Sequence, residues 1–396
     1  MIIRDKPRVL IGFAEAFSAI EAVWSLQDAG VDVFAFTRRG SVSALRRMPG
    51  VTIIEVQAPE QDLARCRREL SAALIGCSPD GFLPLDDSSL WLSRHIDLTQ
   101  TVTIGPDLAG VDFALNKAAQ IGGAMRVGMS VPTTVVFDDV SEVRLDNAPV
   151  IVKPADAVLV SGNRLIRPNG RICADDAELR TAIATMLPGP VLRQRLVRGV
   201  GEGVFGYVGA GGPADLSAHR RLRMLNPQGS ASSACESIDV DPQLADQVIA
   251  MLDLVKWRGL FMAEFLRDSS GTPWFMELNG RAWGSLALAR RRGFEYPAWA
   301  VQSALGLPKS PPAPTAPPHL SARHLGREIA HLAFVFRGPQ TGADVDWPKR
   351  AQTIRALMTV HRGDRLYNWN RRHPEVLARD TWHTLSGLAS SRRAHA

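Results

Sequence analysis

The amino-acid sequence predicts two structural parts: a small doubly wound α/β domain, then a pair of α+β lobes that ends in a helical extension. Between residues 7 and 60, apolar strands flank a helix in the βαβ order of a parallel sheet. From residue 112 onward, antiparallel hairpins and helices replace that order. With 396 residues, of which 45% are hydrophobic, the chain is long enough for two or three domains with a substantial core.

The first part contains five expected strands and two expected helices. The strands are expected at 8–12, 31–36, 51–56, 81–85 and 102–104, and the helices near 22–30 and 60–75. The first βα turn lacks a GxGxxG fingerprint, because Ala14 and Phe17 stand where glycines are needed. This counts against a nicotinamide-dependent oxidoreductase. Asp86 and Asp87 follow the fourth strand, where ligands bind in open α/β sheets; helix N-capping is their alternative role.

The second part is expected to alternate strands and helices up to a proline-rich linker. Helices are expected at 113–127, 175–186 and 242–256, and strands at 133–137, 150–153, 165–166, 191–197, 203–208 and 216–223. A hairpin is expected from strands 259–266 and 273–278. Residues 308–318 are rich in proline and predict a linker. Beyond it, apolar residues at helical spacing predict a helical tail.

Charge and composition exclude several classes of protein. Residues 319–396 hold 13 of the 46 lysines and arginines but only 6 of the 40 acidic residues, so the excess positive charge lies in the tail. A basic pI therefore does not by itself argue for nucleic-acid binding, although a surface contact of the tail with a membrane or nucleic acid stays open. No apolar run is long enough to cross a membrane, and no signal peptide is recognisable. The four cysteines form no CxxC motif, which favours a reducing cytoplasm.

The expected hairpin carries the strongest chemical signal. Glu277 and Asn279 share one face of a strand because side chains alternate, and Glu264 on the neighbouring strand can lie beside them. Two carboxylates and an amide oxygen are hard ligands that suit Mg²⁺. The alternative is a solvent-facing hairpin in which Arg281 forms a structural salt bridge with Glu277.

Two lysines and a basic strand provide weaker signals. Lys153 ends an apolar strand and Lys117 lies early in a helix after Asn116, and either ammonium group could bind phosphate oxygens. Taken alone, a lysine in either position is more often a solvated surface residue. If residues 216–223 form a strand, His219, Arg221 and Arg223 share one face that could bind a phosphate or a carboxylate. A charged edge strand is the alternative interpretation.

Taken in order, the segments that carry these residues resemble the ATP-grasp superfamily of carboxylate–amine ligases, and within it the carbamoyl-phosphate-synthase-like proteins. The resemblance covers residues 8–307, about three quarters of the chain. The matching segments are NKAAQIGGAMRVGMSVPTT at 116–134, VIVKP at 150–154, VLRQRLVRGVGEG at 191–203, AHRRLR at 218–223, FMAEF at 261–265 and FMELNGRAWGS at 275–285.

The resemblance implies a domain order. It consists of a Rossmann-like pre-ATP-grasp domain at 1–110, an ATP-grasp N-lobe at 111–190, a C-lobe at 191–307, the linker at 308–318 and a basic helical tail at 319–396. The implied cofactors are ATP and one or two Mg²⁺ ions, with Mn²⁺ as an alternative.

The resemblance also implies site residues. The residues that would hold the nucleotide are Lys117, Lys153, Gln194, Arg195, Leu196 and, at the ribose, Glu202. The implied metal ligands are Glu264, Glu277 and Asn279. Arg281 resembles the arginine beside the γ-phosphate, and Arg221 and Arg223 are expected to face the same site.

The activity implied is an ATP-dependent ligase that forms an acyl phosphate from a small-molecule carboxylate and joins it to an amine, releasing ADP and phosphate. The alternative is an ATP-binding sensor or scaffold without catalysis. We expect a cytoplasmic protein, and a homodimer is compatible with the fold class.

Overall fold

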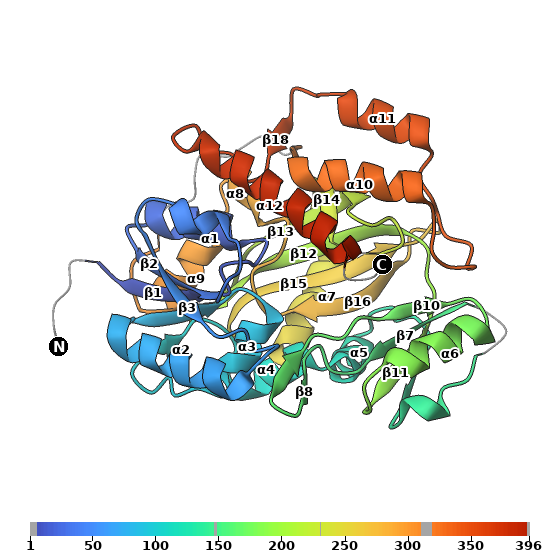
Figure 1. Ribbon diagram of the computed structural model, residues 1–396, viewed down its shortest axis with the longest axis horizontal. Coiled ribbons are helices and arrows are strands. Elements are labelled where there is room, and N and C mark those ends of the chain that lie inside the picture. Colours follow the sequence, from blue (N-terminus) through green and yellow to red (C-terminus); the bar gives the residue numbers. More distant parts are fainter. Residues whose placement is uncertain (1–5, 146–148, 230, 310–318, 394–396) are drawn as a thin grey trace.

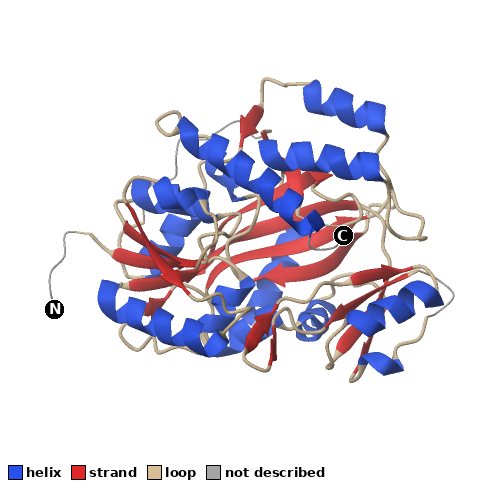
Figure 2. Ribbon diagram, in the orientation of Figure 1, coloured by secondary structure: helices blue, strands red, loops and turns tan. Residues whose placement is uncertain are grey.

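Three large sheets and a two-stranded hairpin organise the described residues, 6–145, 149–229, 231–309 and 319–393, of this computed structural model (Figure 1, Figure 2). Figure 1 shows the N-terminal sheet at the left, a seven-stranded sheet in the centre, a four-stranded sheet at the lower right and the tail helices along the top. The mixture of parallel and antiparallel sheets agrees with the fold class that the sequence predicts.

The N-terminal sheet is parallel, with strand order β3-β2-β1-β4-β5. Its elements are β1 (Arg8–Gly12), α1 (Ala19–Asp28), β2 (Asp32–Arg38), a 3₁₀ turn η1 (Ala44–Arg47), β3 (Val51–Val56), α2 (Leu63–Cys77), β4 (Gly81–Pro84), α3 (Asp87–Ser93) and β5 (Val102–Thr103). The strand order reverses between β1 and β4. The loops that leave these two strands therefore border the crevice in which doubly wound sheets bind ligands.

The four-stranded sheet has the order β10-β7-β11-β6. Its elements are β6 (Thr134–Phe137), η2 (Val140–Glu142), β7 (Val150–Pro154), β10 (Arg171–Cys173), α6 (Asp176–Thr185) and β11 (Val191–Arg195), and β8 (Leu159–Ser161) with β9 (Arg164–Ile166) forms a separate hairpin. The sequence predicts that the C-lobe begins at 191. However, β11 pairs with β6 and β7, so this strand belongs to the smaller sheet.

The helix expected at 113–127 is two helices, α4 (Leu108–Leu115) and α5 (Lys117–Arg126). Asn116 separates them in an extended conformation, and its side chain caps α5 by accepting a hydrogen bond from the backbone of Ala119 at 2.8 Å. The Asn116 amide group also donates to Asp156 at 2.9 Å. Lys117 therefore occupies the first turn of α5, where its position is fixed by the cap.

The seven-stranded sheet has the order β16-β15-β12-β13-β14-β17-β18. The elements are β12 (Val200–Gly209), β13 (Gly212–Met224), β14 (Ser232–Ile238), α7 (Pro242–Asp253), β15 (Gly259–Arg267), β16 (Pro273–Asn279), α8 (Leu286–Arg291), α9 (Tyr296–Ala304), β17 (Ser321–Arg323) and β18 (Asp364–Leu366). The strand β14 is not predicted from the sequence, because its run of serines, alanine and cysteine lacks the apolar alternation of a strand.

The C-terminal extension is built into this sheet as well as packed on it. It contains α10 (Leu325–Arg337), α11 (Arg350–Met358) and α12 (Pro374–Arg393), and it also contributes β17 and β18. From residue 310 onward the predicted linker lies outside the described residues. No described helix is both long and apolar enough to cross a membrane.

A buried carboxylate fixes the extension to the sheet. Glu328 of α10 accepts hydrogen bonds from Arg223 of β13 at 2.6 and 2.9 Å and from Ser233 of β14 at 2.7 Å, and Arg323 lies 3.2 Å away. The Glu328 side chain is only 5% exposed.

Replacing Glu328 by alanine is expected to lower the free energy of unfolding by about 3–5 kcal/mol, because two guanidinium groups would stay buried without their partner. Urea denaturation monitored by tryptophan fluorescence measures this loss. A change below about 1 kcal/mol would contradict an anchoring role for this carboxylate.

Candidate functional site

The two carboxylates of the central hairpin face each other across β15 and β16. Glu264 is directly paired with Glu277, and Asn279 lies two residues further along the same strand. Asn279 Nδ2 donates to Glu264 at 3.1 Å and to Glu277 at 3.4 Å. Arg221 of β13, which is separated from β15 by strand β12, reaches Glu264 and forms an ion pair with it. The pattern of alternation therefore brings the predicted oxygen ligands together.

The environment of these carboxylates fits a hard cation. Burial raises the pKa of the Glu264 carboxyl; the Arg221 guanidinium opposes this rise and the Glu277 carboxylate adds to it. A cation between the two acids would relieve that repulsion. The described residues contain no group of three or more His, Cys, Asp or Glu side chains placed so that they could hold a metal ion. A metal held here would therefore depend on oxygens of a bound ligand as well as on the two carboxylates. The Asn279 amide oxygen could join them if the amide group turned, since its Nδ2 faces both carboxylates in this structure.

The two predicted lysines approach this hairpin from the small sheet and from α5. Lys153 Nζ donates to Gln194 at 3.1 Å, and Gln194 Nε2 donates to Thr134 at 2.9 Å. Burial lowers the pKa of Lys153 to about 8, with Glu277 opposing that change and Lys117 adding to it. The charges of Lys117 and Lys153 therefore act close to each other beside Glu277. Two neighbouring cations of this kind suit a polyphosphate.

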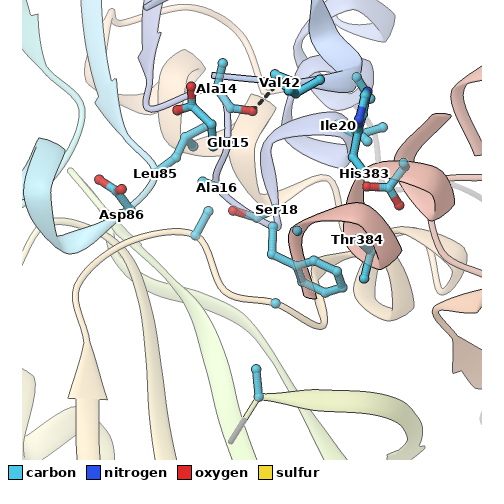
Figure 3. Close-up of a pocket in the computed structure, with 18 of the residues that line it drawn as sticks. Ala14, Glu15, Ala16, Ser18, Ile20, Val42, Leu85, Asp86, His383 and Thr384 are labelled. Carbon is cyan, nitrogen blue, oxygen red and sulfur yellow. Dashed lines mark hydrogen bonds between the residues drawn. The ribbon is translucent and has the colours of Figure 1, made fainter. Parts of the chain in front are cut away.

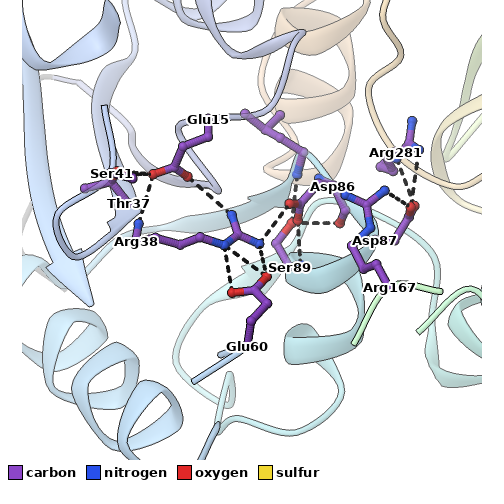
Figure 4. A network of polar contacts seen from close by, with 11 residues as sticks. Glu15, Thr37, Arg38, Ser41, Glu60, Asp86, Asp87, Ser89, Arg167 and Arg281 are labelled. Atoms are coloured by element: carbon purple, nitrogen blue, oxygen red, sulfur yellow. Dashed lines mark hydrogen bonds and ion pairs between the residues drawn. The ribbon is translucent and has the colours of Figure 1, made fainter. Parts of the chain in front are cut away.

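A half-buried aspartate binds the predicted catalytic arginine. Asp87, the first residue of α3, accepts a hydrogen bond from Arg281 Nε at 2.9 Å and one from Arg167 at 2.6 Å (Figure 4). Burial would raise the pKa of Asp87, but the guanidinium groups of Arg281 and Arg167 outweigh it and lower this pKa to about 2. Asp87 therefore fixes the position of two arginines, a role that the sequence does not predict: it indicates only a place at the ligand-binding edge of the sheet or a helix cap. Arg167 carries no sequence signal.

The adjacent residue Asp86 has the capping role. It accepts a hydrogen bond from the backbone of Ser89 at 2.8 Å and closes a capping box on α3. It also lies 3.6 Å from Arg38, which binds Glu60 at 2.7 Å and Glu15 at 3.3 Å (Figure 4). Three carboxylates surround one guanidinium group, so this side of the site carries an excess of negative charge.

Two cavities share the two arginines that Asp87 binds, Arg167 and Arg281. One, of about 430 Å³, is lined by Lys117, Glu277 and Asn279. The other, of about 700 Å³, opens at the carboxyl edge of the N-terminal sheet, where Figure 3 shows Glu15 and Asp86 on one side and the tail residues His383 and Thr384 on another. Arg167 and Arg281 line both cavities. They therefore stand at the junction of a phosphate-like site and a larger pocket.

Two of the predicted site residues lie elsewhere. Arg223 binds Glu328 of the extension, because a register shift between Arg221 and Arg223 interrupts the alternation of β13. Glu202 is committed to Arg220 at 3.0 Å and to Arg267 at 2.7 Å, so its carboxylate is already neutralised.

The three residues of the predicted hinge differ in their contacts. Gln194 is buried against Lys153, whereas Arg195 is exposed and lies 5.1 Å over the ring of Trp274 on β16. The backbone N–H groups of Arg195 and Leu196 donate to the carbonyl groups of Thr133 at 2.9 Å and Pro149 at 3.2 Å. These two N–H groups are thus already used within the protein.

Comparison with known proteins identifies the fold. No protein-family model and no curated protein matches the sequence. An L-amino acid ligase from Bacillus licheniformis has a similar structure, with a TM-score of 0.58 and 16% identity over 76% of this chain and 74% of that chain. N5-carboxyaminoimidazole synthetase from Staphylococcus aureus gives 0.58 and 13% over 84% and 86%. A biotin carboxylase–β,γ-ATP complex from Campylobacter jejuni gives 0.56 and 16% over 77% and 72%.

These likenesses, at low identity, concern the fold. They agree with the sequence resemblance, and the chain has the ATP-grasp fold.

Proposed function

We propose that this chain, which has the ATP-grasp fold, is an ATP-dependent ligase that activates a carboxylate as an acyl phosphate and joins it to an amine, releasing ADP and phosphate. One observation carries the proposal: Arg281 lines both the cavity that contains Lys117 and Glu277 and the larger cavity beside the N-terminal sheet. A group transferred from nucleotide to substrate must cross such a junction.

The proposed reaction has two steps. An oxygen of the substrate carboxylate attacks the γ-phosphorus of ATP, the bond from that phosphorus to the β,γ-bridging oxygen breaks, and ADP leaves with the electron pair. Arg281 stabilises the charge on the transferred phosphoryl group, while Lys117 and Lys153 hold the phosphates. The ammonium group of the second substrate first releases a proton to solvent. The free amine then attacks the acyl carbon, phosphate leaves with the acyl oxygen, and the nitrogen loses a second proton as the amide forms.

Glu264, Glu277 and Asn279 are the residues that would hold Mg²⁺, or Mn²⁺ in its place. The ion would neutralise phosphate charge when bound. The protein contributes to catalysis in two further ways: it aligns the two substrates at Arg281, and it excludes water from the acyl phosphate. The amine, which arrives as an ammonium ion, is proposed to enter along Glu15, Glu60 and Asp86, where negative charge exceeds positive charge.

An acyl-phosphate trap tests the proposed function. The protein is incubated with MgATP, hydroxylamine and pools of metabolite carboxylates, and ADP release and hydroxamate masses are measured. Wild-type protein is expected to form a hydroxamate, and Arg281→Lys is expected to reduce its rate about a hundredfold. Arg180→Lys, on the exposed side of α6, is the matched control. MgATP binding without ADP release in any pool would favour the non-catalytic alternative.

The charge of Lys153 predicts a pH dependence of nucleotide binding. Its pKa is lowered to about 8, so the ammonium group is present below pH 8 and is lost as the pH rises above it. We therefore expect kcat/KM for ATP, which reports the free enzyme, to fall as the pH rises through about 8. Lys153→Arg is expected to remove this decline, because a guanidinium group stays charged. A decline that persists unchanged in Lys153→Arg would assign it to another group.

A further inference from the structure

The larger cavity has a wall made by the C-terminal extension. Arg327 of α10 and Asp380 and His383 of α12 line it together with residues of the N-terminal domain. Helix α12 reaches this place because it packs both on α10 and on η1 of the N-terminal domain. The C-terminal extension therefore forms part of the cavity wall, and its side chains can contact a molecule bound in the cavity.

Arg327 is a cation at this wall without an acidic partner. Its guanidinium group lies 3.2 Å from the centre of the Phe17 ring, and Nη1 donates to the Ser232 carbonyl group at 3.2 Å. Within the described residues it forms no ion pair with a carboxylate. Burial lowers the pKa of Arg327 to about 10, a change that Tyr367 and Asp380 oppose. The loss of hydration at this charge is thus compensated only in part.

The nearby carboxylate is committed elsewhere. Asp380 lies 2.7 Å from His324 Nε2 and accepts a hydrogen bond from Asn368 Nδ2 at 2.8 Å. Four other buried or half-buried arginines have acidic partners within 4 Å. They are Arg223, Arg281, Arg290 and Arg323. Arg327 differs from them in that it faces a cavity instead of a carboxylate.

We propose that Arg327 binds an oxyanion group, a carboxylate or a phosphate, of the molecule that occupies the larger cavity. A guanidinium group matches both through paired N–H donors. Arg281, on the hairpin side, is the group proposed to meet the carboxyl that becomes activated. Arg327 would then bind a second anionic group, and the substrates of the ligase would include a molecule with two acidic groups or an amine that carries one. In this respect the inference rests on the proposed function.

Anion binding by the full chain tests the inference without any turnover. Succinate and inorganic phosphate are titrated separately by calorimetry at constant ionic strength, because salt screens exposed charges. We expect at least one anion to bind the wild type. Arg327→Gln is expected to bind that anion about 10- to 100-fold more weakly. Arg337→Gln, an exposed arginine at the end of the same helix, is expected to match the wild type. A preference for succinate or for phosphate identifies the kind of oxyanion.

A second variant separates binding from folding. Arg327→Lys keeps the charge but loses the paired donors, so it is expected to bind with intermediate affinity and to unfold at the wild-type temperature. Equal affinity of wild type and Arg327→Gln, or no binding of either anion to the wild type, would overturn the inference. Weak binding by Arg327→Gln together with a failed acyl-phosphate trap would leave the anion site intact and reject the ligase. If wild-type protein forms a hydroxamate while Arg327→Gln binds the anion as tightly as the wild type, the ligase is supported and the anion site at Arg327 is rejected.

Discussion

Glu277→Gln is expected to lower the rate of ADP release about a hundred- to a thousandfold, the effect of removing one preorganised electrostatic group from a transition state. Glu277 lies opposite Glu264 in the hairpin and lines the smaller cavity with Lys117 and Arg281. The substitution preserves shape and removes the charge that would hold the cation. Steady-state kinetics at saturating MgATP measure the loss, which we expect in kcat as well as in kcat/KM.

The control for this variant is Glu142→Gln, an exposed glutamate of η2 that should leave the rate unchanged. Because Glu264 lies directly opposite Glu277, Glu264→Gln should give a loss of similar size. A Glu277→Gln protein with more than a tenth of the wild-type rate would mean that the hairpin carboxylates are structural, as the alternative interpretation of the hairpin holds.

Asp87→Asn is expected to lower kcat about a hundredfold, although Asp87 itself touches neither substrate in the proposed mechanism. Its carboxylate binds both Arg281 and Arg167 at the junction of the two cavities. Without that charge the Arg281 guanidinium group is no longer fixed, and a displacement of about 1 Å at a reacting centre can cost a factor of about a hundred. KM for ATP should change little, since the lysines that hold the phosphates stay in place.

A double-mutant cycle distinguishes this positioning role from a loss of stability. In an Arg281→Lys background, Asp87→Asn should cost much less than it costs in the wild type, because both changes act through one group. Asp253→Asn, at the exposed end of α7, is the matched control. Independent, multiplicative losses from the two substitutions would contradict the positioning role of Asp87.

Local patterns predict those parts of the site that depend on neighbouring residues. Glu277 and Asn279 follow from the period-two alternation of one strand, and Glu264 follows from the hairpin turn that pairs its strand with theirs. The role of Lys117 comes from the family resemblance, whereas the Asn116 cap that begins its helix is not predicted, because a single helix is expected over 113–127. The same logic fails for Arg223, since a register shift after Arg221 redirects it to the extension. A single-residue irregularity of this kind leaves no signal in the pattern of residue types.

Contacts between distant segments could not be predicted. Asp87 and Arg281 are separated by 194 residues, and Asp87 gains its role only when α3 meets the end of the central hairpin. Arg327 lies beyond the proline-rich segment, in an extension whose charge alone suggested a surface contact. Its place at the cavity depends on strand β17, which pairs with β14. Sequence periodicity describes one element at a time and cannot specify which elements meet.

Transfer of oxygen-18 from a labelled carboxylate to phosphate tests the central claim most directly. Once the hydroxamate trap has identified an acyl donor, that donor is labelled in its carboxylate group and incubated with MgATP and an amine. The proposed mechanism predicts ADP and one labelled oxygen in each released phosphate, because the acyl oxygen leaves with the phosphoryl group. Unlabelled phosphate, or AMP in place of ADP, would contradict activation of the carboxylate as an acyl phosphate at Arg281.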